Sequence, residues 1–156
     1  MFLTSFLLIK YWLFNRDIIK YFENNHKNLK KIVFFGIASA IALTIHSIFL
    51  GIKFEYELYK LFRRVVILFF IVFEIIAQTY LVICLYKIRY SISENINEIF
   101  LKLKIFLVSL LIIVALISIP IISVPGNKYL KHALEWDYFV GVISFYLLTF
   151  FMWKKN

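Results

Sequence analysis

The chain has little of what many folded soluble proteins depend on. It contains one cysteine, two prolines and four glycines in 156 residues. A single cysteine, Cys84, excludes an intrachain disulfide and a CxxC redox motif. The scarcity of glycine and proline excludes a collagen-like chain and a flexible linker. Charged residues make up 17% of the chain, below the roughly 25% of soluble domains, which argues against an ordinary water-soluble enzyme.

Acidic residues are also scarce compared with basic ones. The chain has 9 Asp and Glu against 18 Lys and Arg, a formal net charge of +9. Such an excess often accompanies nucleic-acid binding. Here, however, Lys and Arg fall in the short stretches between apolar runs, which is typical of membrane proteins. We therefore expect the lipid bilayer, and not nucleic acid, as the partner.

What the chain has in abundance is apolar sequence, because 63% of its residues are hydrophobic and 20% are aromatic. Four apolar runs stand out, at about residues 32–50, 65–86, 105–124 and 136–153. A helix needs about 20 residues to cross the hydrocarbon core, and isolated strands would leave backbone groups unpaired in lipid. The sequence predicts a single membrane domain over residues 1–156, an all-α integral membrane protein built as a four-transmembrane-helix bundle.

Residues 1–31 precede the first of these runs and have a mixed character. Most of residues 2–14 are apolar, but Lys10 falls near their middle and the segment is short for a full span. We interpret residues 1–31 as an interfacial helix followed by a basic linker. Insertion of residues 1–22 as a fifth helix is the alternative.

Positive charge predicts the orientation of the spans. Twelve of the 18 Lys and Arg lie before the first run, between the second and third, or after the fourth. The side of the membrane richer in Lys and Arg is normally cytoplasmic. We therefore expect a multi-pass protein of the cell membrane with both termini in the cytoplasm.

Two connections carry helix-start signals. Ser91 or Ser93 is placed to cap a helix that continues through Glu94 and Glu98 into the third span. Asn127, after the turn-forming Pro125-Gly126 pair, is placed to cap a helix leading into the fourth span.

Glu74 is the most informative single residue, because it lies near the middle of the second predicted span. An ionised carboxylate is costly inside a membrane, so an intramembrane acid is a functional hypothesis by default. Gln78 lies one turn further along the same helix face. The structural interpretation is a protonated Glu74 bonded to Gln78 or to a facing hydroxyl, which would hold helices together. The alternative is a proton-exchanging site that drives transport of a cation or an amine.

Histidines supply a second, weaker set of candidates. His46 lies near the outer end of the first span, and we include it with Glu74 and Gln78 as a proton or ligand site. His132 and Glu135, three residues apart at the start of the last helix, would share a face and could join His46 in a metal site. Haem between two histidines is a further option. None of these spacings matches a known motif, so we expect no cofactor.

Small residues form two stripes suited to close helix packing. On the first span these residues are Gly36, Ala40, Thr44 and Ser47, and on the fourth they include Gly141 and Ser144. Small residues at steps of three or four let another helix approach closely. We expect both stripes to face neighbouring helices.

Together these observations favour a structural or accessory component of a membrane complex, with a homo-oligomer or another membrane protein as its partner. A proton-coupled transporter of small solutes or cations that uses Glu74 is the alternative. Enzymatic activity is disfavoured, because no nucleophile with a convincing base and no catalytic motif is present. If there were such an activity, Glu74 or the pair His132 and Glu135 would supply the acid and base for a membrane-soluble substrate.

Overall fold

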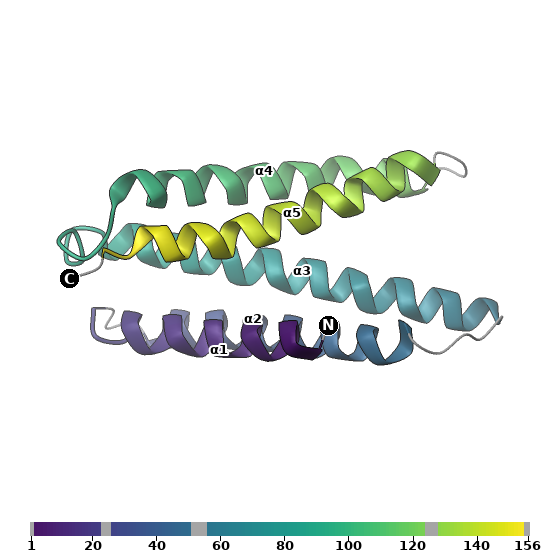
Figure 1. Ribbon diagram of the computed structural model, residues 1–156, viewed down its shortest axis with the longest axis horizontal. Coiled ribbons are helices and arrows are strands. Elements are labelled where there is room, and N and C mark those ends of the chain that lie inside the picture. Colours follow the sequence, from purple (N-terminus) through teal and green to yellow (C-terminus); the bar gives the residue numbers. More distant parts are fainter. Residues whose placement is uncertain (1, 23–25, 51–55, 124–127, 155–156) are drawn as a thin grey trace. The chain divides into compact units, whose positions relative to one another are not determined.

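The computed structural model describes residues 2–22, 26–50, 56–123 and 128–154. These residues form five α-helices that follow one another along the chain (Figure 1). The helices are α1 (Phe2–Ile19), α2 (His26–Leu50), α3 (Glu57–Ile88), α4 (Glu98–Ser123) and α5 (Lys128–Met152). The prediction of an all-helical chain is confirmed.

Three of the helices are long and apolar enough to cross a membrane. The apolar stretches are Asn28–Phe49 in α2, Leu61–Ile88 in α3 and Glu98–Ser118 in α4. At about 1.5 Å of rise per residue, the shortest of them is roughly 31 Å long, which matches a hydrocarbon core of about 30 Å. This finding supports the predicted membrane location.

Helix α5 differs from these three because its apolar part, Trp136–Met152, is shorter. Charged and polar residues, including Lys131 and Asp137, occupy the first part of the helix. The complete helix has 25 residues, or roughly 37 Å at about 1.5 Å per residue. Its length therefore suffices for a span, while its apolar stretch is close to the lower limit of about 17 residues.

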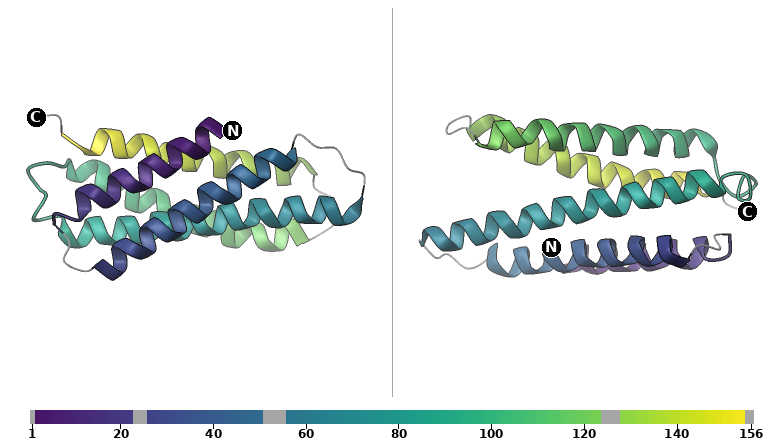
Figure 2. Two further views of the ribbon diagram at one scale, coloured as in Figure 1. Left: turned by 90° about the horizontal axis from the view of Figure 1, so that it is seen from below. Right: turned by 180° about the vertical axis from the view of Figure 1, so that it is seen from behind.

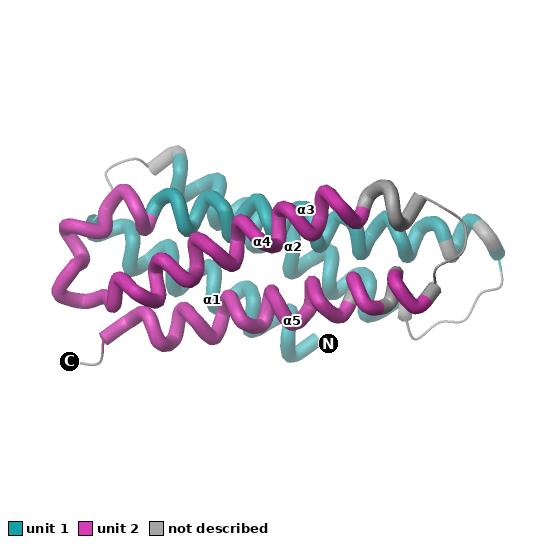
Figure 3. Tube along the Cα trace, turned by 90° about the horizontal axis from the view of Figure 1, so that it is seen from above, with its two compact units in different colours: residues 1–84 teal, residues 85–156 magenta. Residues whose placement is uncertain are grey.

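The chain divides into two compact units, Met1–Cys84 and Leu85–Asn156 (Figure 3). The boundary falls inside α3, near its C-terminal end. The first unit contains α1, α2 and most of α3, and the second contains α4 and α5. Each unit is built on one closely packed pair of consecutive helices, α1 with α2 and α4 with α5.

In the first unit α1 and α2 run side by side in opposite directions (Figures 1 and 2). The buried residues of α1 recur at alternating steps of three and four: Ser5, Leu8, Trp12, Asn15 and Ile19. Buried residues of α2 recur at the same steps: Leu29, Ile32, Gly36, which lies against Trp12 of α1, Ser39 and Leu43. Alternation of this kind is the seam of a coiled coil, in which side chains of one helix fit between those of the other.

Gly36 brings the two helices closest together. A Cβ atom built on Gly36 would lie 2.3 to 2.6 Å from three ring atoms of Trp12. The indole, which is completely buried, therefore occupies the space that any side chain on Gly36 would need. Because the Trp12 ring rests directly on the backbone of α2, no larger residue fits at position 36 without moving one of the helices.

Longer side chains join α2 to α3. The ring of Phe35 lies 5.8 Å from that of Phe73 and is stacked on Tyr80 at 6.3 Å, measured between centroids. At the other end of α2, Phe49 contacts Phe62 edge to face at 5.1 Å. Aromatic pairs in these geometries contribute about 0.5–1.5 kcal/mol each beyond the area they bury.

In the second unit α4 and α5 pair in the same way. The buried residues that define the α4 seam are Leu101, Lys104, Val108 and Leu111, and those of α5 are Tyr138, Val142, Phe145, Thr149 and Met152. Their spacing again alternates between three and four residues. One position on the α4 seam is a lysine, which makes this seam unlike that of an ordinary apolar pair.

The segment between α3 and α4 corrects one sequence prediction. Residues 89–95 form turns, and α4 begins only at Glu98. Asn97, and neither Ser91 nor Ser93, caps α4, because its Oδ1 accepts a hydrogen bond from the Ile99 amide at 3.0 Å. The predicted cap Asn127 lies outside the described residues.

The same segment is hydrogen-bonded to the end of α5. The Asn97 amide donates to the Met152 carbonyl at 2.8 Å, and the Lys154 amide donates to the Asn95 carbonyl at 2.9 Å. These two bonds enclose an antiparallel bridge between Ile96 and Trp153. The last described residues of the chain are therefore fixed to the α3–α4 connection.

Candidate functional site

Glu74 of α3 forms a polar cluster in the first unit with Ser39 of α2 and Gln78 of α3. The side chains of all three residues are completely buried. Complete burial removes these groups from solvent. Each polar atom must therefore find its hydrogen bonds within the protein.

Both carboxyl oxygens of Glu74 have partners. Its Oε2 lies 2.7 Å from the hydroxyl of Ser39, and its Oε1 accepts a hydrogen bond from the Gln78 amide nitrogen at 3.0 Å. The bond to Ser39 crosses from α3 to α2. The bond to Gln78 stays on α3 and depends on the spacing of four residues that the sequence shows.

The hydroxyl of Ser39 serves two oxygens with one proton. Besides Glu74 it lies 2.8 Å from the Gly36 carbonyl on its own helix. If the hydroxyl donates to that carbonyl, Glu74 must donate to Ser39, and the carboxyl must carry a proton. If Glu74 is ionised, the hydroxyl donates to Glu74 and leaves the Gly36 carbonyl. A neutral carboxyl that donates to Ser39 would satisfy both short contacts with full hydrogen bonds.

The side-chain oxygen of Gln78 completes the cluster. This Oε1 atom is buried and has no hydrogen-bond partner among the residues that the structure describes. A buried acceptor without a donor is destabilising by about 1–3 kcal/mol. The cluster therefore retains one acceptor that a donor of suitable size would satisfy.

His46 is not part of this cluster. It lies toward the other end of α2, near Arg63 at the start of α3, and it is half-buried. Arg63 and Glu74 are separated by roughly 16 Å along α3, at about 1.5 Å per residue. The structure therefore brings Glu74 and Gln78 together but leaves His46 apart from them.

The predicted metal site of His46, His132 and Glu135 stays a prediction. The side chains of His132 and Glu135 lie outside the described residues. Among the described residues no group of three or more His, Cys, Asp or Glu is placed to hold a metal ion. His46 belongs to the first unit, whereas His132 and Glu135 belong to the second.

The small-residue stripe of α2 divides into two parts. Gly36 contacts Trp12, and Ala40 is completely buried. Thr44 and Ser47 are half-buried. Their hydroxyls donate hydrogen bonds to backbone carbonyls of α2, at residues 40 and 43 respectively. Hydroxyls bonded in this way satisfy themselves without a partner helix.

On α5 the corresponding stripe faces α4 at one residue. A Cβ atom on Gly141 would lie 2.5 Å from Cδ2 of Leu111, and Gly141 is buried. Ser144 is half-buried. The contact at Gly141 therefore repeats, with a more flexible neighbour, the close approach of Gly36 to Trp12.

Lys104 is the polar residue that sequence reasoning missed. Lys104 directly precedes the apolar run at residues 105–124, where a lysine is typical of the membrane border. The structure places it within α4 and buries it completely. Its ammonium donates to the hydroxyl of Thr149 at 2.5 Å and lies 4.0 Å from the centroid of the Phe145 ring. The Thr149 hydroxyl in turn lies 3.1 Å from the Phe145 carbonyl, so it accepts from Lys104 and donates to its own helix.

The sequence does carry a signal for this burial. Leu101, Lys104, Val108 and Leu111 lie at steps of three, four and three, so they share one face of a helix. A lysine in such a register lies on the packing seam. Because Lys104 lies at the edge of an apolar run, its position favours the membrane surface, and its register on the helix is easily overlooked.

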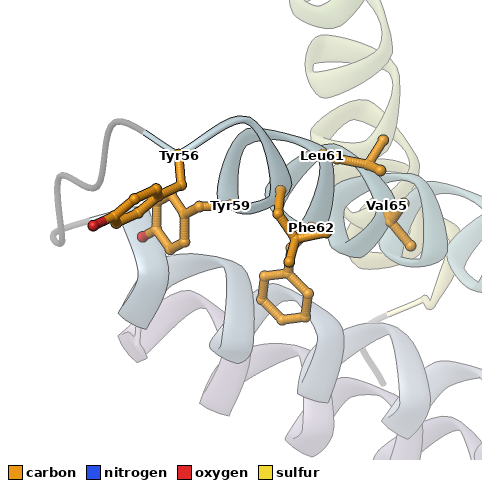
Figure 4. Close-up of a pocket in the computed structure, with 6 residues that line it drawn as sticks. Tyr56, Tyr59, Leu61, Phe62 and Val65 are labelled. Carbon is orange, nitrogen blue, oxygen red and sulfur yellow. The ribbon is translucent and has the colours of Figure 1, made fainter.

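A shallow apolar hollow of about 700 Å³ lies at the start of α3 (Figure 4). Tyr56, Tyr59, Leu61, Phe62 and Val65 line it together with one more leucine. The hydroxyl of Tyr59 donates to the Phe49 carbonyl and so ties this end of α3 to α2. The hollow offers no charged side chain and no buried polar group, so it supplies no chemistry of its own.

The fold and the Glu74 cluster define a class: a helical protein with three helices that could span a membrane and a buried polar link between two of them. No protein family, curated protein or solved structure matches the chain. Function must therefore be argued from the residues themselves.

Proposed function

We propose that this chain is a small multi-pass membrane protein with a structural or accessory role in a membrane complex, and that neutral Glu74 is an interhelical link within it. The observation that supports this role is the complete burial of Glu74 with both oxygens in contact with Ser39 and Gln78. A carboxyl engaged on both sides has a local structural use that needs no substrate. Hydrogen bonds between membrane helices contribute about 0.6 kcal/mol on average and up to about 2.

For the topology we propose that helices α2 to α5 each span the cell membrane, with the C-terminus in the cytoplasm, and that α1 adds a fifth span. The bias of Lys and Arg supports this orientation. The sequence expectation of an interfacial helix at residues 1–31 is revised in this proposal. A surface helix lies in the membrane plane, whereas α1 follows α2 from Ile19 to Ser5 with a continuous seam.

We therefore propose that α1 is inserted beside α2 as the first arm of a helical hairpin. This places the N-terminus on the outer side, and not in the cytoplasm with the C-terminus. Lys10 opposes insertion, since a lysine at the bilayer centre is destabilising by about 2.5–3.5 kcal/mol on insertion scales. Its ammonium lies 5.5 Å from the Phe6 ring centroid, one turn nearer the N-terminus. This is the direction in which a lysine reaches toward the outer headgroups.

Infrared titration of the Glu74 carboxyl in lipid tests the proposed link. The Glu74→Gln variant identifies the band, because the amide removes it and leaves the rest of the spectrum unchanged. A neutral-acid band that persists to about pH 9 supports a structural hydrogen bond. Ionisation between about pH 6 and 8 contradicts it and indicates a proton-exchanging site.

One observation favours a second function, a proton-coupled transporter of small solutes or cations. The unpartnered Oε1 of Gln78 is an acceptor beside Glu74 that a protonated amine would satisfy. Proteoliposomes with a pH gradient measure this function directly. Uptake of an organic cation by the wild type, and none by Glu74→Gln, supports the transporter and replaces the structural proposal.

A further inference from the structure

A cleft of about 750 Å³ lies in the first unit, where α1 ends and α2 begins. Its volume is within the roughly 300–1,000 Å³ of typical ligand sites. Two kinds of side chain line it. Arg16, Lys20 and Lys30 are basic, whereas Leu29, Val33 and Phe34 are apolar; Asp17 is the remaining lining residue.

The charge of the cleft favours an anion. Its single acid, Asp17, is paired with Arg16, with 2.8 Å between Nη2 and Oδ1. Lys20 and Lys30, both exposed, leave a net charge of two positive units. The Arg16 guanidinium has five N–H donors, and its Nε and Nη2 both contact one oxygen of Asp17, so donors remain for a phosphate.

The apolar side of the cleft has the arrangement that a lipid tail needs. Leu29 is buried and forms part of the wall, whereas Phe34, five residues further along α2, is 66% exposed. Val33 lies between them in sequence and is half-buried. Along α2 the apolar lining residues therefore lie on both sides of Lys30, with Leu29 before it and Val33 and Phe34 after it.

The position of the cleft fits the surface of a membrane. The apolar stretch of α2 begins at Asn28, so Lys30 lies in its first turn and Val33 and Phe34 lie deeper. In a membrane, Lys20 and Lys30 would thus lie at headgroup level, and Val33 and Phe34 at the level of the first acyl carbons, with Arg16 near the depth of Val33. Basic pockets between spanning helices on the cytoplasmic side are the places where anionic lipid headgroups bind.

We propose that this cleft is a binding site for an anionic phospholipid such as phosphatidylglycerol. Arg16, Lys20 and Lys30 contact the headgroup phosphate, and Val33 and Phe34 contact the acyl chain. The proposal is independent of the role given to Glu74, which belongs to a different set of residues. Its failure would leave that role untouched.

Lipid retention by the full-length protein in a neutral detergent tests the proposal, with phosphatidylglycerol and phosphatidylcholine added in turn and bound lipid counted by native mass spectrometry. The wild type should retain phosphatidylglycerol in preference. The variant Arg16→Gln/Lys20→Gln/Lys30→Gln should weaken this retention by about tenfold or more, since each basic group near a lipid surface contributes about 1 kcal/mol. Detergent removes any effect of these charges on membrane orientation.

The matched control is Lys87→Gln/Lys102→Gln/Lys154→Gln, which removes the same charge from three exposed residues outside the cleft. Its retention should stay within about twofold of the wild type. Equal loss in both triple variants would show diffuse charge attraction and overturn the site. If the cleft variant unfolds, the single variants Arg16→Gln and Lys30→Gln replace it, and each should lower retention.

A second pair of measurements separates the lipid from free phosphate. Phe34→Ala should weaken phosphatidylglycerol retention by about two- to threefold, because contact with an acyl chain is lost. Millimolar inorganic phosphate should not displace the lipid more than sodium chloride of equal ionic strength does. Displacement by phosphate together with an inert Phe34→Ala would overturn the lipid in favour of a free anion.

Discussion

Ser39 and Glu74, 35 residues apart in sequence, join α2 to α3 through a contact of 2.7 Å between Oγ and Oε2. Because Ser39 also lies 2.8 Å from the Gly36 carbonyl, the pair connects the backbone of one helix to the carboxyl of the other. The same stretch of α2 carries the contact of Gly36 with Trp12 of α1. A single turn of α2 therefore holds both neighbouring helices of its unit.

Glu74→Gln should unfold at nearly the same temperature as the wild type. A glutamine at position 74 keeps the shape of a neutral acid, donates to Ser39 and accepts from Gln78. Glu74→Ala removes both bonds and leaves buried partners, so it should lower the free energy of unfolding by about 2–4 kcal/mol. Thermal unfolding in detergent compares the three proteins. Equal losses for the amide and the alanine would show that the ionised carboxylate is needed.

Gly36→Ala should lower the free energy of unfolding by about 1–3 kcal/mol, because the new methyl overlaps the rigid Trp12 ring. Gly141→Ala is the matched comparison, since its methyl meets only the flexible end of Leu111. It should be less harmful by about 1 kcal/mol. In a Trp12→Ala background the effect of Gly36→Ala should disappear. If the two changes are additive instead, the helices do not meet at this point.

Thr149→Val should destabilise the protein by about 1.5–3 kcal/mol, because it removes a hydrogen bond to the buried ammonium of Lys104. Lys104→Met should be tolerated, since a methionine of similar length fills the same space without a charge. In the Lys104→Met protein, Thr149→Val should then have little effect. A double-mutant cycle on thermal unfolding measures this coupling, and Thr149→Ser, which keeps the hydroxyl, is the control.

Asn97→Ala should weaken the start of α4 by about 0.5–2 kcal/mol, because the Ile99 amide loses the oxygen that caps it. Asn97→Asp keeps this oxygen and should retain the stability. Hydrogen exchange at the amides of residues 99–101 reports the effect locally. Faster exchange in both variants would mean that the side chain acts in another way.

Labelling of cysteines near the two ends of the chain tests whether α1 is inserted in the membrane or lies at its cytoplasmic surface. In a Cys84→Ala background, single cysteines at Phe2 and Lys154 are labelled in sealed cells with an impermeant maleimide. If α1 is inserted, the cysteine at Phe2 reacts from outside and that at Lys154 reacts only after permeabilisation. Protection of both ends would instead place α1 at the cytoplasmic surface.

The sequence predicted the long helices well, because an apolar run that can cross a membrane has few other structures available. It also placed Glu74 and Gln78 on one face, since that relation is local. It did not identify Ser39 as the partner of Glu74, because contacts between helices depend on their relative rotation. The seam of α1 was missed for a related reason: the polar residues Ser5 and Asn15 occupy two of its five positions and interrupt the apolar pattern.

Lys104 shows that the position of a lysine beside an apolar run does not by itself predict its exposure. A lysine near the end of an apolar run normally marks the membrane surface. In α4 the helix begins six residues earlier, at Glu98, so this lysine falls in the second turn and points at α5. A lysine at the membrane surface and a lysine buried on the seam lie at the same distance from the edge of the apolar run. Only the register of the residue on the helix distinguishes them.

The bridge between Ile96 and Trp153 also has a consequence for the order of assembly during synthesis. The second unit is closed by residues 152–154, which are synthesised after α4 and nearly all of α5. The hairpin of α1 and α2 needs only the first 50 residues and can form while the rest of the chain is still being made. A chain truncated before residue 152 therefore keeps all the residues of the first unit but lacks the contacts that close the second.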